Sequence, residues 1–174
     1  MKLSKKILIF IFTFFLSNTA FAENKIVYLN VDKVMAVSKA GKSIKTQLDK
    51  IHKSNIENFK KAEEKLKKDE KTLIAKKNIL SQEDFKKEFD KLRNDAQKYQ
   101  QERSKEIQNV NSKRITASKK IITLMNPLLA KYADENGIAI IISKNNIIMG
   151  QNQLDISDEI IKLVDSEIKP FKLK

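Results

Sequence analysis

Few side chains in this chain of 174 residues could support catalysis or metal binding. It contains one histidine, His52, no cysteine and no glycine-rich phosphate loop. The acidic pairs Glu63-Glu64 and Asp69-Glu70 stand among lysines, and Glu64 precedes Lys68 by the spacing of ion pairs on a helix surface. We therefore interpret His52 as a packing or surface residue and the acids as solvated charges. We expect no enzymatic activity, no cofactor and no metal site.

Positive charge is the most prominent chemical feature of the chain. The formal net charge is +13, and residues 42–120 hold 23 Lys or Arg against 13 Asp or Glu. Such a surface could bind phosphate groups. However, acids are interleaved with the lysines and few aromatic side chains could stack on bases, so we predict no physiological nucleic acid partner. The charge favours acidic polypeptides, or the anionic headgroups of lipid or lipopolysaccharide.

The first residues, MKLSKKILIFIFTFFLSNTAFAENK, have the organisation of a secretory signal peptide. Lysines precede an apolar run at residues 7–16, and Ala20-Phe21-Ala22 forms a small-x-small cleavage site. The run is shorter than the roughly 20 residues of a membrane span, although an uncleaved anchor is the alternative. We predict a signal peptide at residues 1–22, cleaved after Ala22, and export of one domain. Without disulfides, that domain must gain stability from helices, packing or association.

Residues 42–126 lack glycine and proline and are rich in residues that favour helix. Two heptad-like series of mainly apolar residues run through them, and we call these the first and second seams. The first seam is Ile44, Leu48, Ile51, Phe59, Ala62, Leu66, Asp69, Leu73, Lys76 and Leu80, and the second is Phe85, Phe89, Leu92, Ala96, Tyr99, Arg103, Ile107, Val110, Arg114, Ala117, Ile121, Leu124 and Leu128. Between them, Ser81-Gln82-Glu83-Asp84 resembles a capping box. The pattern predicts an antiparallel helical hairpin, an arm of roughly 55–60 Å, rather than one continuous helix.

The flanking residues 23–41 and 127–174 predict a small β-rich body, which makes the fold α+β and mainly α. Strands are expected at residues 25–31, 138–143 and 146–150, the last two joined by a tight turn at Lys144-Asn145-Asn146. A short helix is expected between an Asp32 N-cap and Gly41. A final helix is expected after a cap at Asp155 or Ser157.

Residues 138–142 are all apolar, so this strand would present apolar side chains to both faces of the sheet. The short helices can cover only one face, so we predict that other copies of the chain cover the second. The alternative is a monomer in which the base of the arm folds over the sheet. The residues expected between copies are Ile26, Tyr28, Ile140, Ile142, Ile147 and Met149.

This layout resembles the Skp/OmpH family of periplasmic chaperones over essentially the whole chain after the leader. The resemblance lies in the opening KIVYLNVDKVM, the basic hairpin and the closing GIAIIISKNNIIMGQNQLDISDEIIKLV. It implies a periplasmic trimer with a β-barrel-like body and three helical arms. The cavity between the arms would hold unfolded outer-membrane proteins without ATP. Pro127 falls where the arm would re-enter the body, and we expect a kink there.

Contacts with such a client are expected from basic and apolar residues of the arm, because many weak contacts hold a chain that must remain extractable. The candidates are Ile56, Ile74, Lys76, Lys77, Ile79, Lys86 and Lys87. One alternative is an arm that serves only as a spacer with a solvated tip. Another is an envelope protein whose basic arms bind anionic lipid or lipopolysaccharide.

Overall fold

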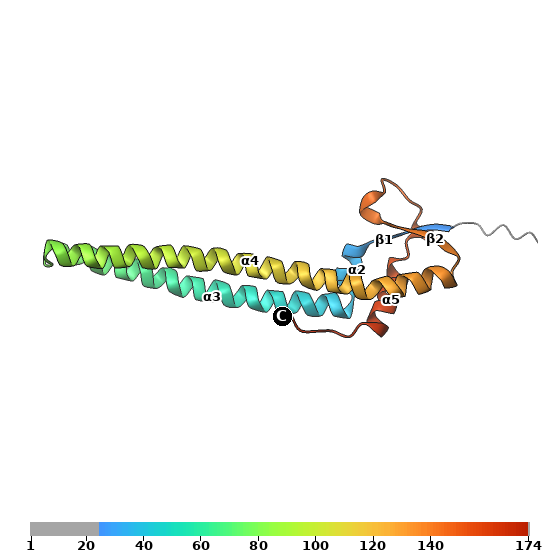
Figure 1. The fold of residues 1–174 in the computed structure, drawn as a ribbon, viewed down its shortest axis with the longest axis horizontal. Helices are drawn as coiled ribbons and strands as arrows, with labels where there is room; N and C mark the ends of the chain where they lie inside the picture. The colour runs from blue at the N-terminus through green and yellow to red at the C-terminus, as the bar shows by residue number, and fades with distance from the viewer. Residues whose placement is uncertain (1–24, 174) are drawn as a thin grey trace, which may run out of the picture.

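Two long helices lie side by side and project from a small body (Figure 1). The computed structural model describes residues 25–173, and the predicted signal peptide at residues 1–22 lies outside them. In chain order the elements are β1 (Lys25–Leu29), α2 (Val31–Val37), α3 (Lys39–Ala75), α4 (Gln82–Glu135), β2 (Ile138–Ser143), 3-10 turns at Lys144–Asn146 and Asn152–Leu154, and α5 (Ser157–Glu167). The prediction of a mainly helical α+β fold with a long hairpin is confirmed.

The hairpin turns at the predicted capping motif. α3 ends at Ala75 and α4 begins at Gln82, with Ser81 as its N-cap. The Ser81 hydroxyl accepts a hydrogen bond from the Asp84 N–H at 3.1 Å and donates one to the Asp84 carboxylate at 2.6 Å. Acidic side chains in this first turn also complement the positive end of the helix dipole. A hairpin, rather than one continuous helix, is therefore confirmed.

Both hairpin helices extend further into the body than residues 42–126. α3 starts at Lys39, and α4 continues through Pro127 to Glu135. A proline removes one helical hydrogen bond, but Met125 before it and Leu128 after it pack in or against the core, which supports the helix on both sides. The predicted boundaries at residues 42 and 127 therefore cut through continuous helices, and the kink at Pro127 stays a prediction.

The two seams are buried unevenly along the hairpin. Near the body, Ile44, Ala117 and Ile121 are at most 3% exposed. Within residues 45–116, only Leu73 and Tyr99 are buried. The outer part of the arm therefore has a thin interface between its helices rather than a core.

Three apolar residues of the predicted second seam are exposed. Phe89, Ile107 and Leu124 are all at least 40% exposed, and Met125 is buried where Leu124 was expected. An α-helix has 3.6 residues per turn, so it drifts against a strict heptad pattern unless it supercoils to compensate. A heptad pattern extended toward the body therefore selects Leu124 instead of its buried neighbour Met125.

α2 differs from the prediction at both ends. Asn30, not Asp32, is the N-cap, and its side chain accepts a hydrogen bond from a backbone N–H of the first turn at 2.9 Å. The helix ends at Ser38, which also caps α3. Gly41 does not close α2 but lies in the first turn of α3, where a Cβ would stand 1.8 Å from the Met35 carbonyl oxygen. Only glycine allows α2 to pack this closely on α3.

Within residues 25–173 the sheet has two strands, β1 and β2, which run parallel. Parallel strands need a crossover connection, and here α2 and the entire hairpin form it. The third strand predicted at residues 146–150 is wrong, because Lys144–Asn146 forms a 3-10 turn and the chain then leaves the sheet. The predicted tight turn needs positive φ, which among the described residues only Gly137 adopts.

The second edge of β1 is occupied at a single point. Tyr28 forms an isolated parallel bridge with Asp155, and the Ile156 N–H donates to the Tyr28 carbonyl at 3.0 Å. Immediately after this bridge, α5 begins at Ser157. The Asp155 carboxylate accepts hydrogen bonds from the Ser157 N–H at 3.0 Å and from the Ser157 hydroxyl. Asp155 therefore helps to start α5, but the predicted cap at Asp155 or Ser157 is wrong, because Ile156 occupies the N-cap position.

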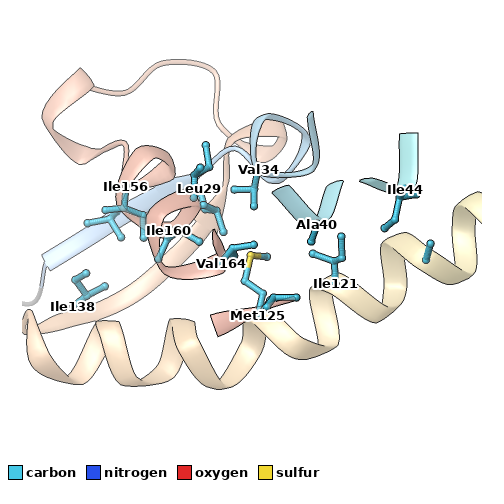
Figure 2. Close-up of a cluster of buried hydrophobic side chains, with 14 residues drawn as sticks. Leu29, Val34, Ala40, Ile44, Ile121, Met125, Ile138, Ile156, Ile160 and Val164 are labelled. Carbon is cyan, nitrogen blue, oxygen red and sulfur yellow. The ribbon is translucent and has the colours of Figure 1, made fainter. Parts of the chain in front are cut away.

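The core lies where the strands, α2, α5 and the inner ends of α3 and α4 meet (Figure 2). Every one of these elements contributes a buried side chain to it. Ten of them are labelled in Figure 2: Leu29, Val34, Ala40, Ile44, Ile121, Met125, Ile138, Ile156, Ile160 and Val164. This core fixes the base of the arm to the body.

No helix within residues 25–173 is both long and apolar enough to cross a membrane.

Candidate functional site

The tip of the hairpin brings together six of the seven predicted client-contact residues, which all lie within residues 74–87. The turn is held by backbone hydrogen bonds, in which the N–H groups of Ile79 and Leu80 donate to the Lys76 carbonyl at 2.9 and 3.0 Å. Ile56 does not belong to this group. It lies on α3, 18 residues before Ile74, or about 27 Å along the helix.

The four tip lysines differ in their partners. Lys76 lies 3.7 Å from the Glu88 carboxylate across the hairpin, and Lys87 lies 2.9 Å from Glu83 on its own helix. Lys77 and Lys86 are exposed and form no ion pair with any residue of the described chain. The uncompensated charge of the tip is therefore concentrated on Lys77 and Lys86, a distinction that composition alone did not give.

Apolar side chains accompany this charge on the tip surface. Ile74 is 63% exposed and Ile79 is 82% exposed, and Ile56 farther down α3 is 52% exposed. Ile74 lies in the last turn of α3, and Ile79 lies in the connecting turn that also carries Lys77. The tip therefore offers hydrophobic contact and positive charge in the same small area.

A polar cluster halfway along the arm was missed by the sequence analysis. The Tyr99 hydroxyl on α4 donates to the Glu63 carboxylate on α3 at 2.6 Å, and Arg103 lies 3.6 Å from the same oxygen. The Phe59 ring meets Tyr99 edge to face, with 6.2 Å between ring centroids. The hydrogen bond to Glu63, aided by burial, raises the pKa of Tyr99. The signal in the sequence was the placement of Tyr99 and Arg103 within a seam.

The structure changes the interpretation of the paired acids Glu63 and Glu64. Glu63 joins α3 to α4, whereas the sequence suggested a charge paired only along its own helix. Glu64 and Lys68 are both exposed and do not form the predicted ion pair. Glu63 is therefore a structural residue of the arm.

Two open grooves follow the interface between the arm helices. We call the first the root groove; it has a volume of about 680 Å³ and is mostly apolar, and His52 lies on its rim. Its apolar lining comprises Val31, Met35, Ile44, Leu48, Ile107, Val110 and Ile122. The second, the mid-arm groove, has a volume of about 490 Å³ and includes Leu66, Phe89, Leu92 and Tyr99. Such open grooves suit side chains of an extended polypeptide better than an enclosed small molecule.

The residues predicted to lie between copies occupy different environments. Ile26 and Ile140 are paired in register and are 49 and 50% exposed, while Val27 and Leu29 on the opposite face of β1 are buried in the core. Ile142 is partly buried. The sheet therefore has one face covered by its own chain and one face that is apolar and half-open.

The loop after β2 covers part of that second face. Tyr28 is 6% exposed, because Gly150 packs against its ring and the Lys144 ammonium lies 5.6 Å from the ring centroid. Ile147 is partly buried, whereas Met149 is 91% exposed. Tyr28 thus makes most of its contacts within its own chain, whereas the Met149 side chain is almost fully exposed.

Within residues 25–173 no three His, Asp or Glu side chains converge to hold a metal ion. His52 is exposed at the root groove and does not belong to the cluster of Glu63, Tyr99 and Arg103. What the arrangement can provide is a long surface with many weak apolar and charged contacts.

Comparisons with known proteins agree on this architecture. Residues 25–164 match the family model described as "Outer membrane protein (OmpH-like)". A crystal structure of an OmpH-like protein from Caulobacter crescentus CB15, described as an outer membrane chaperone, superposes with a TM-score of 0.78. The two chains share 16% sequence identity, and the match covers 86% of this chain and 88% of the other, so it shows a common fold. A comparison with curated proteins found no match.

Proposed function

Because the chain belongs to the OmpH-like family of outer membrane proteins, we propose that it is a chaperone for exported proteins. Its task is that of an ATP-independent holdase: it binds unfolded outer-membrane β-barrel proteins and prevents their aggregation before membrane insertion. The similar Caulobacter structure is described as an outer membrane chaperone, which supports this reading. The proposed location is the periplasm, reached after cleavage behind Ala22. Mass analysis of the exported protein should then find Glu23 as its first residue.

The observation that carries the proposal is the combination of exposed isoleucine and unpaired lysine at the arm tip. Ile74 and Ile79 are exposed, and Lys77 and Lys86 lack acidic partners within the described chain. An unfolded client exposes apolar side chains, and an acidic client is attracted by the lysines at longer range. Weak contacts repeated along the arm give useful total affinity while each remains easily broken.

The holdase proposal is tested by diluting a urea-unfolded outer-membrane barrel into buffer and following light scattering. The intact protein should suppress aggregation. A double variant with Ile74→Ser and Ile79→Ser should suppress it several-fold less, because both changes remove exposed apolar contact without touching the core. Ile148→Ser, which alters an exposed isoleucine of the body loop, serves as the matched control. Equal suppression by all three proteins would refute a role for the tip.

We further propose that copies associate through the open sheet face and form a trimer whose arms surround the client. Ile26 and Ile140 leave an apolar face half-open, and an unpaired charge on a covered apolar face is strongly destabilising. Ile140→Asp should therefore reduce the mass measured by light scattering to that of one chain. Ile115→Asp, at a similarly exposed isoleucine of the arm, should leave the mass unchanged. An unaltered mass for Ile140→Asp would contradict association through this face.

A second candidate function uses the same tip at an anionic surface. Ile79 beside Lys77 could insert into the headgroup region of lipid or lipopolysaccharide while the lysine meets phosphate. Sedimentation with anionic liposomes or with lipopolysaccharide separates the two candidates. Strong co-sedimentation without suppression of barrel aggregation would favour the envelope-surface role, whereas the reverse result would favour the holdase.

A further inference from the structure

The last described residues form an extended segment that returns along the arm. After α5 ends at Glu167, Ile168 is buried in the core and residues 169–173 adopt neither helix nor strand. Figure 1 shows this segment leaving the body and running beside α3. We call residues 169–173 the C-terminal strap.

One side chain of α3 holds the backbone of the strap. The Gln47 side-chain amide donates to the Phe171 carbonyl at 2.9 Å, and its oxygen accepts from the Leu173 N–H at 3.0 Å. A single primary amide thus satisfies a backbone acceptor and a backbone donor two residues apart. This is the pattern that a neighbouring strand would provide, so the strap is fixed in register on α3.

The strap also reaches the second helix of the arm. The Lys120 ammonium on α4 lies 4.1 Å from the centroid of the Phe171 ring. Phe171 and Leu173 line a small hollow of about 260 Å³ together with Ala117 and Thr116 of α4. Because Gln47 belongs to α3 and Lys120 to α4, the strap lies across the interface between the two arm helices.

A second attachment lies nearer the body. The Asp165 carboxylate on α5 accepts a hydrogen bond from the Lys39 N–H at 2.6 Å, at the first residue of α3. Gln47 follows Lys39 by eight residues, about 12 Å along the helix. The core holds the inner end of α3 through Ala40 and Ile44, and the strap adds a support farther out along the same helix.

The two attachments differ in how easily they break. Asp165 sits on a helix whose apolar face is part of the core. The strap is held by two neutral hydrogen bonds, one cation–π contact with the exposed Lys120, and the partly buried side chains of Phe171 and Leu173 at the edge of the core. Contacts of this kind only narrowly offset the conformational entropy lost by ordering an extended segment. Segments with this balance open locally while the rest of the protein remains folded.

We propose that the C-terminal strap is a releasable brace that fixes the angle between the arm and the body, and that its release lets the arm swing. The movement of the arm depends only on contacts within one copy of the chain. Its consequence rests on the proposed holdase function: if arms of several copies surround a client, the angle of each arm sets the room between them. Release of the strap would then admit larger clients.

The test measures a distance between the arm and the body by double electron–electron resonance spectroscopy. This distance changes when the angle of the arm changes. The chain lacks cysteine, so Asn58→Cys on the arm and Lys162→Cys on α5, both exposed, give two specific spin labels. An excess of unlabelled chain keeps each measured distance within one molecule. Gln47→Met removes both hydrogen bonds to the strap at nearly constant size, and a variant ending at Ile168 removes the strap. Gln97→Met, at an exposed position of α4 away from the strap, is the matched control.

We expect the distance distribution to become at least twofold wider in Gln47→Met and wider still in the shortened chain, with Gln97→Met like the parent. Hydrogen exchange at the Leu173 N–H should accelerate at least tenfold in Gln47→Met. Distributions that superimpose for Gln47→Met and the parent would overturn the brace, even if the shortened chain failed to fold. No client is present in these measurements. Their failure would therefore leave the holdase proposal standing, and failure of aggregation suppression by the parent would leave the brace standing.

Discussion

The two ends of the hairpin are made from the same two helices but have opposite surfaces. At the inner end, Ile121 and Met125 are at most 1% exposed, whereas Ile74 and Ile79 at the tip are 63 and 82% exposed. The inner end is covered by the strands, α2 and α5, and nothing in the described chain covers the tip (Figure 1). The comparison teaches that the inner end supplies the stability of the fold, and that the tip keeps its apolar groups available.

The polar groups of the two ends follow the same division. At the inner end, Ser38 and Ser157 are fully buried, and each has hydrogen-bond partners. Along the arm the ion pairs are exposed, and pairs of that kind contribute little to stability. The arm must therefore depend on helix propensity and on the thin seam around Leu73 and Tyr99, so it should open locally before the body does.

The largest expected effect comes from Ile121→Ala at the inner end. Ile121 is completely buried, so truncation should lower the free energy of unfolding by about 3 kcal/mol, the usual cost of a cavity in a packed core. Urea unfolding followed by circular dichroism measures it. Ile107→Ala on the same helix is the control, because Ile107 is 60% exposed, and it should change the value by less than about 0.5 kcal/mol.

Similar losses for the two variants would contradict the contrast between the ends. They would also restore the sequence-based assignment, which placed both Ile107 and Ile121 in the second seam. The structure and the heptad pattern thus give different rankings for the same pair of residues.

The accuracy of the sequence analysis depended on how local the determining contacts are. The hairpin turn was predicted because Ser81 and Asp84 interact across three residues. The α2 cap and the role of Gly41 were predicted wrongly. Gly41 is required by its contact with Met35 on another helix, and the Asn30 N–H is bonded to Ser157, which is 127 residues away. Single-residue propensities carry no information about such distant contacts.

The prediction of a third strand at residues 146–150 was wrong for a related reason. Residues 146–150 are apolar enough for a strand, but strand formation also needs a free edge and a suitable turn. In the structure Lys144–Asn146 adopts a 3-10 turn instead of a hairpin turn, so the residues that follow do not return along β2. The apolar pattern of residues 146–150 carries no information about the conformation of the turn that precedes them.

The candidate site was predicted as a region but not in its detail. Composition placed the positive charge on the arm, yet Lys76 and Lys87 are paired with acids while Lys77 and Lys86 are not. The Glu63–Tyr99 hydrogen bond joins residues 36 positions apart, so it depends on the register between two helices. Register follows from the packing of the inner core, which the sequence pattern describes only in outline.

A smaller effect is expected from Leu73→Ala in the outer arm. Leu73 is 5% exposed, but the seam around it is thin and can partly collapse, so we expect a local cost of about 2 kcal/mol. Hydrogen exchange near residues 70–90 should accelerate, while the amides of α5 keep their protection. Ile74→Ala, at the exposed neighbour, should leave both regions unchanged. Equal acceleration in α5 would show that arm and body unfold together.

A fall in pH should destabilise the body more than the arm, because Asp155 lies in the body. Partial burial works against ionisation of this carboxyl, but hydrogen bonds from Ser157 and the charge of Lys144 outweigh it, so the pKa of Asp155 lies below its usual value. A lowered pKa in the folded state contributes stability above the ordinary aspartate pKa of about 4, and this contribution is lost as the pH falls through the lowered value.

Asp155→Asn should therefore melt at a lower temperature than the parent at pH 7, and the difference should shrink toward pH 2. Asp49→Asn provides the comparison from the arm, because Asp49 and its partner Lys45 are both largely exposed. We expect its melting temperature to follow the parent across the same pH range. A constant difference between Asp155→Asn and the parent from pH 7 to pH 2 would show that the charge of Asp155 does not stabilise the body.

The smallest effect on stability, and the sharpest on function, is expected at the tip lysines. Lys77→Gln with Lys86→Gln removes the two unpaired charges, and Lys76→Gln with Lys87→Gln removes two that already face acids. Neither pair should change the melting temperature measurably, because all four side chains lie outside the core. On the proposed function, the first pair should slow association with an acidic unfolded barrel several-fold at low salt, and the second pair should slow it less. Stopped-flow fluorescence across a salt series measures both, since the Debye length falls from about 10 Å at 0.1 M to about 3 Å at 1 M. The rates of the parent and of the first variant should therefore converge at high salt, whereas equal rates at every salt concentration would mean that the tip charge plays no part in capture.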